Sequence, residues 1–478
     1  FFFFFRQISL GTVIALADGA RILFALGVLF FFFYPAMSMT YDTNGHNGTK
    51  PCSVQCANVM KLGALTGDDP LPNPNGILVE VSCTDADQLI GNKDNDVWNY
   101  IDDLAREKTV LKNDEFKKMQ QALGFKHNPL GLLADAALRQ YISPTEAMCW
   151  DWVHIYLCNG IGGQELSCVM DSIEPLGLGA DNIQREILHW RWPAWLRKTG
   201  VTAQAASEVF AKKRAVPQGW KSSASEFLSV VHIVLHWLET NVATELPLPV
   251  TSFRNLVNVI DHILLLKSCA STDFAGLKPR IVKHLQSMKS TYGEDGEVGS
   301  KGHTAHHLGD QDERDELVFD TFPLERGHQV SKAHATTIKL GNGFEKAVLV
   351  RTIASQCHAL STMDERPHIG TDEYWSNEIG AFVSKALDFE GLHVEANDYV
   401  IVGSEVVKLS LCGRLNTSFF VLGTSCPLIS KLSVSSFVVG TSDRLRLVGM
   451  SSGLVRLAKC WRSVPNSNDD VVVLVPSV

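Results

Sequence analysis

Asp151-Trp152-Val153-His154 and, far downstream, Glu325-Arg326-Gly327-His328 are the two stretches that decide the fold prediction. Each places a carboxylate near a histidine, and apolar residues flank it. A charge in an apolar setting requires a partner or a metal ion. An N-cap aspartate and a surface helix glutamate would explain either stretch alone. The two stretches together favour a shared metal site.

The order of several motifs resembles that of the CACTA (En/Spm-like) DNA transposases. Asp151-x-x-His154, followed by Phe322-Pro323-Leu324-Glu325-Arg326, is similar to the second and third acidic positions of that family. His46-Asn47-Gly48-Thr49-Lys50-Pro51-Cys52, then Cys56-Ala57-Asn58-Val59, resembles its G-x-x-G-x-x-C-x-x-C-x-N-V segment. His303-Thr304-Ala305-His306-His307-Leu308 resembles the H-x-x-x-H-L element before the final Glu. The likeness extends from about Ala17 to Ile338.

The resemblance implies an α/β fold, with a ribonuclease H-like mixed sheet and a large helical insertion before the final Glu. It also implies metal-dependent DNA strand cleavage and transfer by a DDE-type enzyme, with DNA as the partner, a nuclear location and room for a homo-oligomer. Asp18, Asp151 and Glu325 would hold two Mg²⁺ (or Mn²⁺) ions, about 3.5–4 Å apart. Mg²⁺ prefers oxygen ligands, which these carboxylates supply. His154 would orient Asp151 or the phosphate.

Composition shifts and hydrophobic periodicity divide the chain into five parts. Residues 1–45 form an unusual apolar N-terminus that includes Asp18 after the β-type run Gly11–Ala17; residues 46–159 are the first part of the core, 160–310 the helical insertion, 311–390 the Glu325-bearing helix and a following helical segment, and 391–478 a small β-rich module. Helices are predicted over Asp96–Leu123, Leu130–Leu138, Ser225–Thr240, Leu256–Leu266, Leu277–Met288 and Asp364–Ala386. Tyr292–Glu316 is predicted to interrupt the helical pattern with glycines and charges.

The apolar run Ile22–Met37 allows two main interpretations, since Pro35-Ala36-Met37-Ser38 is a poor cleavage site for a signal peptide. It falls short of the roughly 20 residues that a spanning helix needs, although a short membrane anchor is conceivable. Alternatively, Leu26–Asn44 is an insertion that interrupts a transposase core, which leaves the assignment of Asp18 open.

Charge and cysteine usage restrict the function further. The formal net charge of −9 argues against broad, sequence-independent DNA binding. Local basic faces remain, at Lys212-Lys213-Arg214 and at Arg191, Arg197 and Lys198 among three tryptophans, although solvated helix ends and core tryptophans would explain both. Eleven irregularly spaced cysteines in a chain of this size indicate reduced thiols and not a disulfide framework.

Three Cys or His groupings are alternative metal ligands. Cys52 and Cys56 are separated by three residues where the family has two, and a zinc site would need a second ligand pair, for which Cys83 is the nearby candidate. His303 and His307 fit the family's structural element better than a zinc site. His232, His236 and Glu239 have helical spacing that suits a metal, but core histidines explain them better.

Two rival functions stay open. One is a non-catalytic remnant of a transposase that retains the core and cuts nothing. The other is an interaction protein without catalysis, either soluble or anchored in a membrane by Ile22–Met37. The distances among the carboxylates of Asp18, Asp151 and Glu325 would discriminate between these functions and an active transposase.

Overall fold

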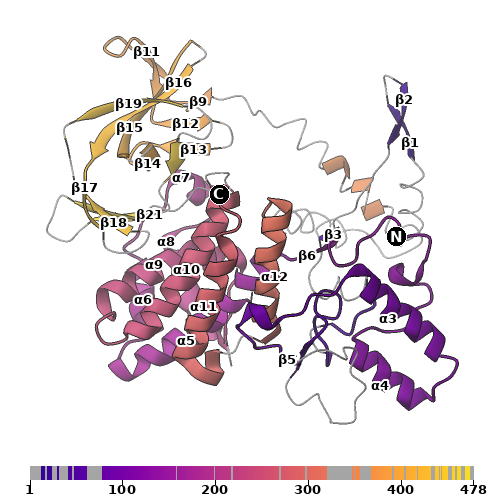
Figure 1. The fold of residues 1–478 in the computed structure, drawn as a ribbon. Coiled ribbons are helices and arrows are strands. Elements are labelled where there is room, and N and C mark those ends of the chain that lie inside the picture. Colours follow the sequence, from indigo (N-terminus) through magenta and orange to yellow (C-terminus); the bar gives the residue numbers. More distant parts are fainter. Residues whose placement is uncertain are drawn as a thin grey trace. The chain divides into compact units, whose positions relative to one another are not determined.

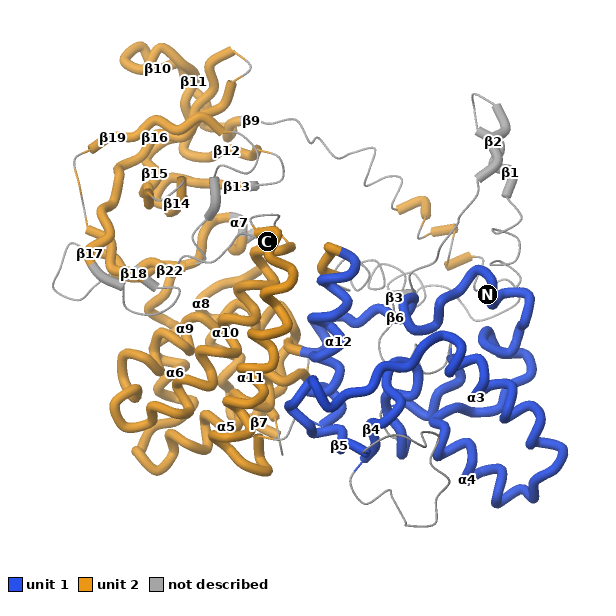
Figure 2. The backbone as a smooth tube through the Cα atoms, in the orientation of Figure 1, with its two compact units in different colours: residues 1–155, 297–315 blue, residues 156–296, 316–478 orange. Residues whose placement is uncertain are grey.

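The chain divides into two compact units in the computed structural model (Figures 1 and 2). Unit 1 comprises residues 1–155 and 297–315, and unit 2 comprises residues 156–296 and 316–478. The structure describes residues 12–16, 19–23, 30–31, 41–45, 48–61, 78–157, 159–198, 200–216, 219–267, 271–296, 299–319, 347–348, 350–351, 353–355, 368–389, 392–402, 405–416, 418–431, 436–440, 442, 444–450, 455–457, 460–463 and 469–473.

The described strands of unit 1 pair two by two. Strands β1 (Thr12–Leu16) and β2 (Gly19–Leu23) are antiparallel, β3 (Phe30–Phe31) and β6 (Met148–Cys149) are parallel, and β4 (Val59–Met60) and β5 (Val79–Glu80) are parallel. Strand β1, which precedes Asp18, and strand β6, which precedes Asp151, therefore belong to different sheets in the described part of the chain. A mixed α/β class is confirmed, whereas the described strands do not form a single ribonuclease H-like sheet.

Helices α3 (Asp94–Glu107) and α4 (Asn113–Leu123) replace the single helix predicted over Asp96–Leu123. Each begins where a carboxylate three residues ahead accepts the backbone N–H of the N-cap residue, from Lys93 to Asp96 and from Lys112 to Glu115. Helix α4 ends at Gly124, whose φ of 81° suits a left-handed C-cap. The helix predicted over Leu130–Leu138 is wrong beyond a short 3₁₀ turn, Leu132–Ala134.

Helix α12 (Gly299–Asp315) also belongs to unit 1 and contradicts the predicted interruption over Tyr292–Glu316. Its three glycines and many polar residues weaken intrinsic helix propensity. Nine of its residues are buried all the same, among them the consecutive residues Gly302 to His306, so the helix is buried on several sides. Tertiary packing, which sequence periodicity does not show, therefore outweighs propensity here.

Unit 2 contains a helical body (Figure 1). Its helices are α5 (Ile161–Ile173), α6 (Ala180–Ile187), α7 (Ala194–Lys198), α8 (Ala203–Ser207), α9 (Ala224–Asn241), α10 (Pro247–Lys267) and α11 (Leu277–Tyr292), with a small hairpin of β7 (Ala215–Val216) and β8 (Gly219–Trp220). The predictions over Ser225–Thr240, Leu256–Leu266 and Leu277–Met288 are confirmed. Helix α9 is buried almost all round, as its apolar sequence predicted, and Ser223 with Glu226 forms its capping box.

A β-rich module follows in unit 2 and begins earlier than predicted. Its strands are β9 (His368–Ile369), β10 (Tyr374–Ser376), β11 (Ala381–Ser384), β12 (Ala386–Phe389), β13 (Leu392–Glu395), β14 (Tyr399–Val402), β15 (Glu405–Leu415), β16 (Ser418–Cys426), β17 (Leu428–Lys431), β18 (Ser436–Val439), β19 (Leu445–Gly449), β20 (Val455–Leu457), β21 (Cys460–Ser463) and β22 (Asp470–Val473). They form sheets of seven, three and four strands.

The helix predicted over Asp364–Ala386 is therefore wrong, because the described residues 368–389 are strands β9–β12. Trp375 and Phe382 are seven residues apart, which fits one face of a helix and also fits a hairpin. In the structure they are directly opposed on β10 and β11, with ring centroids 5.1 Å apart. Cross-strand aromatic pairing stabilises the hairpin instead.

Within the described ranges, no helix is long and apolar enough to cross a membrane. The described part of the apolar run Ile22–Met37 comprises the end of β2 and strand β3.

Candidate metal centre and the Asp151 segment

Asp151 lies two residues beyond β6, at the start of the π-helical turn Val153–Leu157. Its side chain is 7% exposed and contacts His154 through Oδ2 and Nδ1. Its other oxygen, Oδ1, accepts the backbone N–H of Val153 at 3.1 Å. The carbonyl of His154 accepts a hydrogen bond from Lys301 Nζ on α12 at 3.0 Å. The D-x-x-H motif therefore forms a local Asp–His contact just beyond strand β6, which fits one of the two roles expected for His154.

Asp18 and Glu325, the other two predicted carboxylates, lie outside the described residues. Their convergence on Asp151 stays a prediction.

Cys52 and Cys56 lie on one buried turn of unit 1, in which the backbone N–H of Cys56 donates to the carbonyl of Cys52 at 2.9 Å. This short-range hydrogen bond brings the two thiols to the same side of the chain. Val59 and Val81 pack around them in a small apolar core. The extra residue between the cysteines, relative to the family motif, is accommodated by this turn.

His303 and His307 project from one face of α12, one helical turn apart. His307 Nε2 lies 3.1 Å from Cys52 Sγ, 3.5 Å from Cys56 Sγ and 3.0 Å from His303 Nε2. The four ligand atoms all lie within 4.8 Å of one another. Two residue pairs separated by about half of the chain thus form one cluster that can hold a metal ion.

Burial and mutual charge decide the protonation of this cluster. Burial alone would raise the pKa of Cys52, but the hydrogen bond with Cys56 and the charges of His307 and His303 hold the pKa of Cys52 well below its usual value. The same hydrogen bond, together with burial, raises the pKa of Cys56. Burial lowers the pKa of His303, which favours the neutral imidazole that a metal requires.

Lys50 adds a buried cation close to the cysteines. Its side chain is fully buried and its ammonium lies 5.1 Å from the centre of the Tyr100 ring. Burial lowers the pKa of Lys50 to about 8, and the neighbouring Cys52 and Cys56 oppose that shift.

The donor set distinguishes this cluster from the predicted magnesium site. Two cysteine sulfurs and two imidazole nitrogens suit zinc and other soft or borderline metals. Mg²⁺ selects oxygen ligands, and this cluster offers none. The sequence contains both pairs, but nothing in it shows that His303 and His307 complete the ligand set of Cys52 and Cys56. The available signal was weak: two histidines at helical spacing, in a segment predicted to be irregular.

Trp150 connects this cluster to Asp151. Its indole stacks on the ring of His307, with centroids 5.8 Å apart and planes at 14°. Its indole N–H donates to Gln55 Oε1 at 2.5 Å, and Gln55 lies between the two cysteines. Gln311, one turn beyond His307, accepts the backbone N–H of Trp150 at 2.5 Å and donates to its carbonyl at 3.1 Å.

The other histidines predicted as less favoured ligands are core residues of unit 2. His232 Nε2 lies 2.6 Å from Asp261 Oδ1, while His236 packs edge-on against Trp190. Burial, and then the charge of Arg462, lowers the pKa of His236 to about 4. Glu239 pairs with Arg254 at 2.5 Å. These residues therefore form separate pairs and not one ligand set.

A buried polar network in the helical body was not predicted. Glu165 Oε1 accepts a hydrogen bond from Ser252 Oγ at 2.6 Å, and Glu165 Oε2 lies 2.7 Å from His284 Nε2. All three side chains are buried, so the network joins α5, α10 and α11 in their interior.

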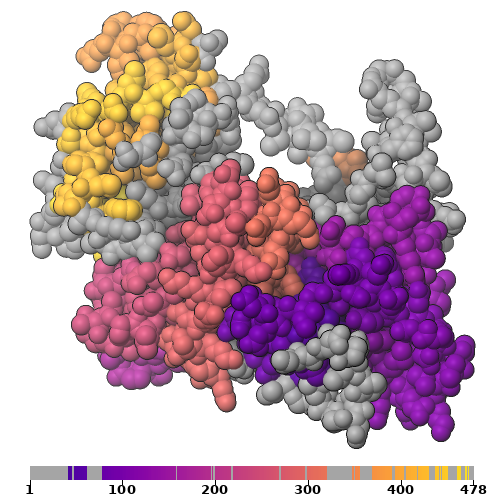
Figure 3. Space-filling model, viewed as in Figure 1, coloured from indigo at the N-terminus to yellow at the C-terminus, as the bar shows by residue number. Residues whose placement is uncertain are grey.

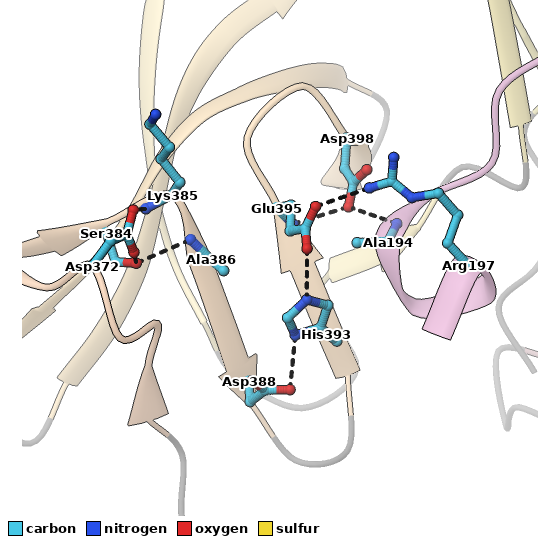
Figure 4. Close-up of polar contacts among 10 residues, drawn as sticks. All are labelled: Ala194, Arg197, Asp372, Ser384, Lys385, Ala386, Asp388, His393, Glu395 and Asp398. Carbon is cyan, nitrogen blue, oxygen red and sulfur yellow. Dashed lines mark hydrogen bonds and ion pairs between the residues drawn. The ribbon is translucent and has the colours of Figure 1, made fainter. Parts of the chain in front are cut away.

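Figure 4 shows a second polar cluster in unit 2, where α7 meets strand β13. His393 contacts Asp388 through Nδ1 at 2.9 Å and Glu395 through Nε2 at 3.1 Å, and Glu395 pairs with Arg197 at 2.9 Å. Because His393 uses both ring nitrogens on carboxylates, this cluster joins two elements and is not a ligand set. Arg197, predicted as part of a basic and aromatic face, belongs to this joint, and the nearby Trp190 and Trp192 are buried.

Comparisons with protein-family models, with curated proteins and with solved structures find no match.

Proposed function

We propose that this protein is a transposase-like enzyme of the ribonuclease H-like DDE class, which cleaves and joins DNA strands with Mg²⁺ held by Asp18, Asp151 and Glu325. The observation that carries the proposal is the meeting of Cys52 and Cys56 with His303 and His307, next to the Asp151 strand end. The resemblance gave these segments in order along the chain, and proximity in space is an independent property. A nuclear location follows from the proposal.

The Cys/His cluster is proposed to hold zinc as a structural ion. Two thiolates balance the charge of Zn²⁺, so the loaded site is neutral and its burial costs little electrostatic free energy. Such a site would link the segment around Cys52 to α12 without taking part in the chemistry. Cys52, Cys56, His303 and His307 would be its ligands.

Asp151 and His154 are proposed to act at the DNA phosphodiester. Mg²⁺ would supply a polarised phosphate and an activated water or 3′-hydroxyl. Asp151 contributes a carboxylate whose direction is fixed by the N–H of Val153 and by His154. His154 is half-buried, so it can orient Asp151 and still face a substrate.

The exposed face of α11 is the best-supported surface for the DNA backbone. The helix carries the exposed residues Arg280 and Lys283 and the half-buried Lys278 and Lys289, and it has no acidic residue; Arg280 also pairs with Asp273, which precedes the helix, at 3.6 Å. Its apolar residues, Ile281, Leu285 and Met288 among them, are buried. In Figure 3, the part of the helical body that contains α11 is found by its colour on the residue bar, and it lies at the surface of the molecule. A local basic stripe of this kind reconciles DNA binding with a net charge of −9.

The deciding experiment is a Mg²⁺-dependent strand-cleavage assay on the full chain. Wild type should cleave, and Asp151→Ala and Glu325→Ala should each lower the rate by at least about 100-fold while zinc content and DNA binding persist. Glu313→Ala, which alters an exposed carboxylate on α12, is the matched control and should retain activity. DNA binding without cleavage in wild type would instead support the non-catalytic remnant.

A further inference from the structure

We infer that metal binding at the Cys52/Cys56/His303/His307 cluster fixes the position of the Asp151–His154 pair, with Trp150 as the link and Gln311 and Gln55 as positioning residues. The structural link stands on the contacts of unit 1 alone. Its consequence for catalysis rests on the proposed function.

Trp150 is held by both elements that carry the ligands. From the cysteine turn, Gln55 accepts the indole N–H at 2.5 Å and donates to the carbonyl of Thr145 at 3.4 Å, so it also holds the chain before β6. From α12, the ring of His307 covers the indole. The metal would join these two elements, and Trp150 lies in contact with each of them.

Gln311 fixes the backbone at the same residue. Its amide group makes both hydrogen bonds that a neighbouring strand would make to Trp150, one to the N–H and one to the carbonyl. The Gln311 side chain is 2% exposed, so these bonds are shielded from water. Leaving the backbone N–H and carbonyl of Trp150 without partners in this interior would be costly. The two hydrogen bonds therefore hold Trp150, at the end of β6, in a fixed position relative to α12.

The fixed position of Trp150 matters because Asp151 is the next residue in the chain. With the N–H and carbonyl of Trp150 fixed, the backbone of Asp151 has little freedom, and its side chain is then set by Val153 and His154. Lys301, on the first turns of the same helix, holds the carbonyl of His154 at 3.0 Å. Helix α12 thus contacts the chain on both sides of Asp151 and carries two metal ligands between these contacts.

Hydrogen exchange of the peptide covering residues 148–157 tests the link on the full chain. We expect the loaded protein to exchange about tenfold more slowly there than protein treated with a chelator, which corresponds to the loss of about one buried hydrogen bond. In Gln311→Ala that still binds one zinc, the loaded protein should exchange about tenfold faster at this peptide than loaded wild type. Gln286→Ala, an exposed glutamine on α11, is the matched control and should leave the peptide unchanged.

Two results would overturn the inference. One is equal exchange of residues 148–157 in loaded wild type and loaded Gln311→Ala. The other is equal exchange in loaded and metal-free wild type. The comparison between loaded proteins remains decisive even if removal of the metal unfolds unit 1.

Cleavage is a separate readout: loaded Gln311→Ala should lose turnover and keep its affinity for DNA. A wild type that never cleaves would contradict the proposed function and leave the exchange result intact.

Discussion

Cys52 and His307 approach to 3.1 Å although 255 positions separate them, so a single substitution at either should abolish the metal site. We expect Cys52→Ser and His307→Ala to lower bound zinc from one equivalent to nearly none, because three ligands remain and a neutral hydroxyl is a poor donor. Metal analysis of the purified chain, and the absorption of a Co²⁺-substituted sample, measure this. Cys83→Ser is the control, because Cys83 is not in the cluster. Zinc retained in both variants would refute the ligand assignment.

Asp312 on α12 predicts a pH dependence of stability. Burial raises the pKa of Asp312 to about 8, although the hydrogen bond from Gln311 opposes the shift. A folded-state pKa above the unfolded one means that the folded state holds the proton more tightly. The stability that the proton on Asp312 gives to the folded state is therefore fully present below about pH 4 and is lost as pH rises toward 8.

Asp312→Asn cannot ionise, so it should become more stable relative to wild type as pH increases from 5 to 8. One pKa unit corresponds to about 1.4 kcal/mol, and we expect a change of roughly 2 kcal/mol or more across this range. Urea unfolding at several pH values measures it. The exposed neighbour Glu313→Gln should run parallel to wild type. Parallel curves for Asp312→Asn and wild type would show that Asp312 is ionised in the folded protein.

Helix α11 is the element on which the proposed DNA interaction depends. We expect the triple change Lys278→Ala, Lys283→Ala, Lys289→Ala to weaken duplex binding and to reduce the slope of log affinity against log salt by about 0.9 for each phosphate that is no longer neutralised. Fluorescence anisotropy at several salt concentrations measures both. The pair Lys117→Ala, Lys118→Ala on α4 removes exposed lysines that lie among acidic residues and should have little effect. An unchanged salt slope for the α11 variant would place the DNA elsewhere.

The elements also show how far periodicity predicts this fold. Helices α9, α10 and α11 were predictable because their apolar residues repeat at helical spacing over long runs. The hairpin of β10 and β11 was not, because the seven-residue spacing of Trp375 and Phe382 fits a helix equally well. Helix α12 was missed because its glycines and histidines become helical through contacts with distant residues, Trp150 and Cys52 among them.

The same physics limits the prediction of the site. The Asp151–His154 pair was predictable, since its residues are three apart and the contact is local. The Cys/His cluster combines two local pairs, each predictable as a pair, but their meeting depends on the tertiary structure of unit 1. A sequence shows spacing along the chain and does not show which distant turn lies opposite a helix face.

At the scale of the whole molecule, the metal would close a very long loop of the chain, whose two ends lie in unit 1 and whose middle, residues 156–296, belongs to unit 2. Ligands separated by as many as 255 positions connect the cysteine turn to α12, while unit 2 contributes none of them. A metal that binds only the folded state stabilises that state by about 2.7 kcal/mol when the concentration of free metal is 100 times its dissociation constant.

We therefore expect a chelator to destabilise unit 1 and to leave the cores of unit 2 nearly unchanged. Hydrogen exchange should report faster exchange in α3 and α12 after chelation, with α9 and β15 as internal references. Equal loss of protection in α9 and α12 would mean that the two units unfold as one, and unchanged protection in α12 would mean that the cluster does not stabilise the fold.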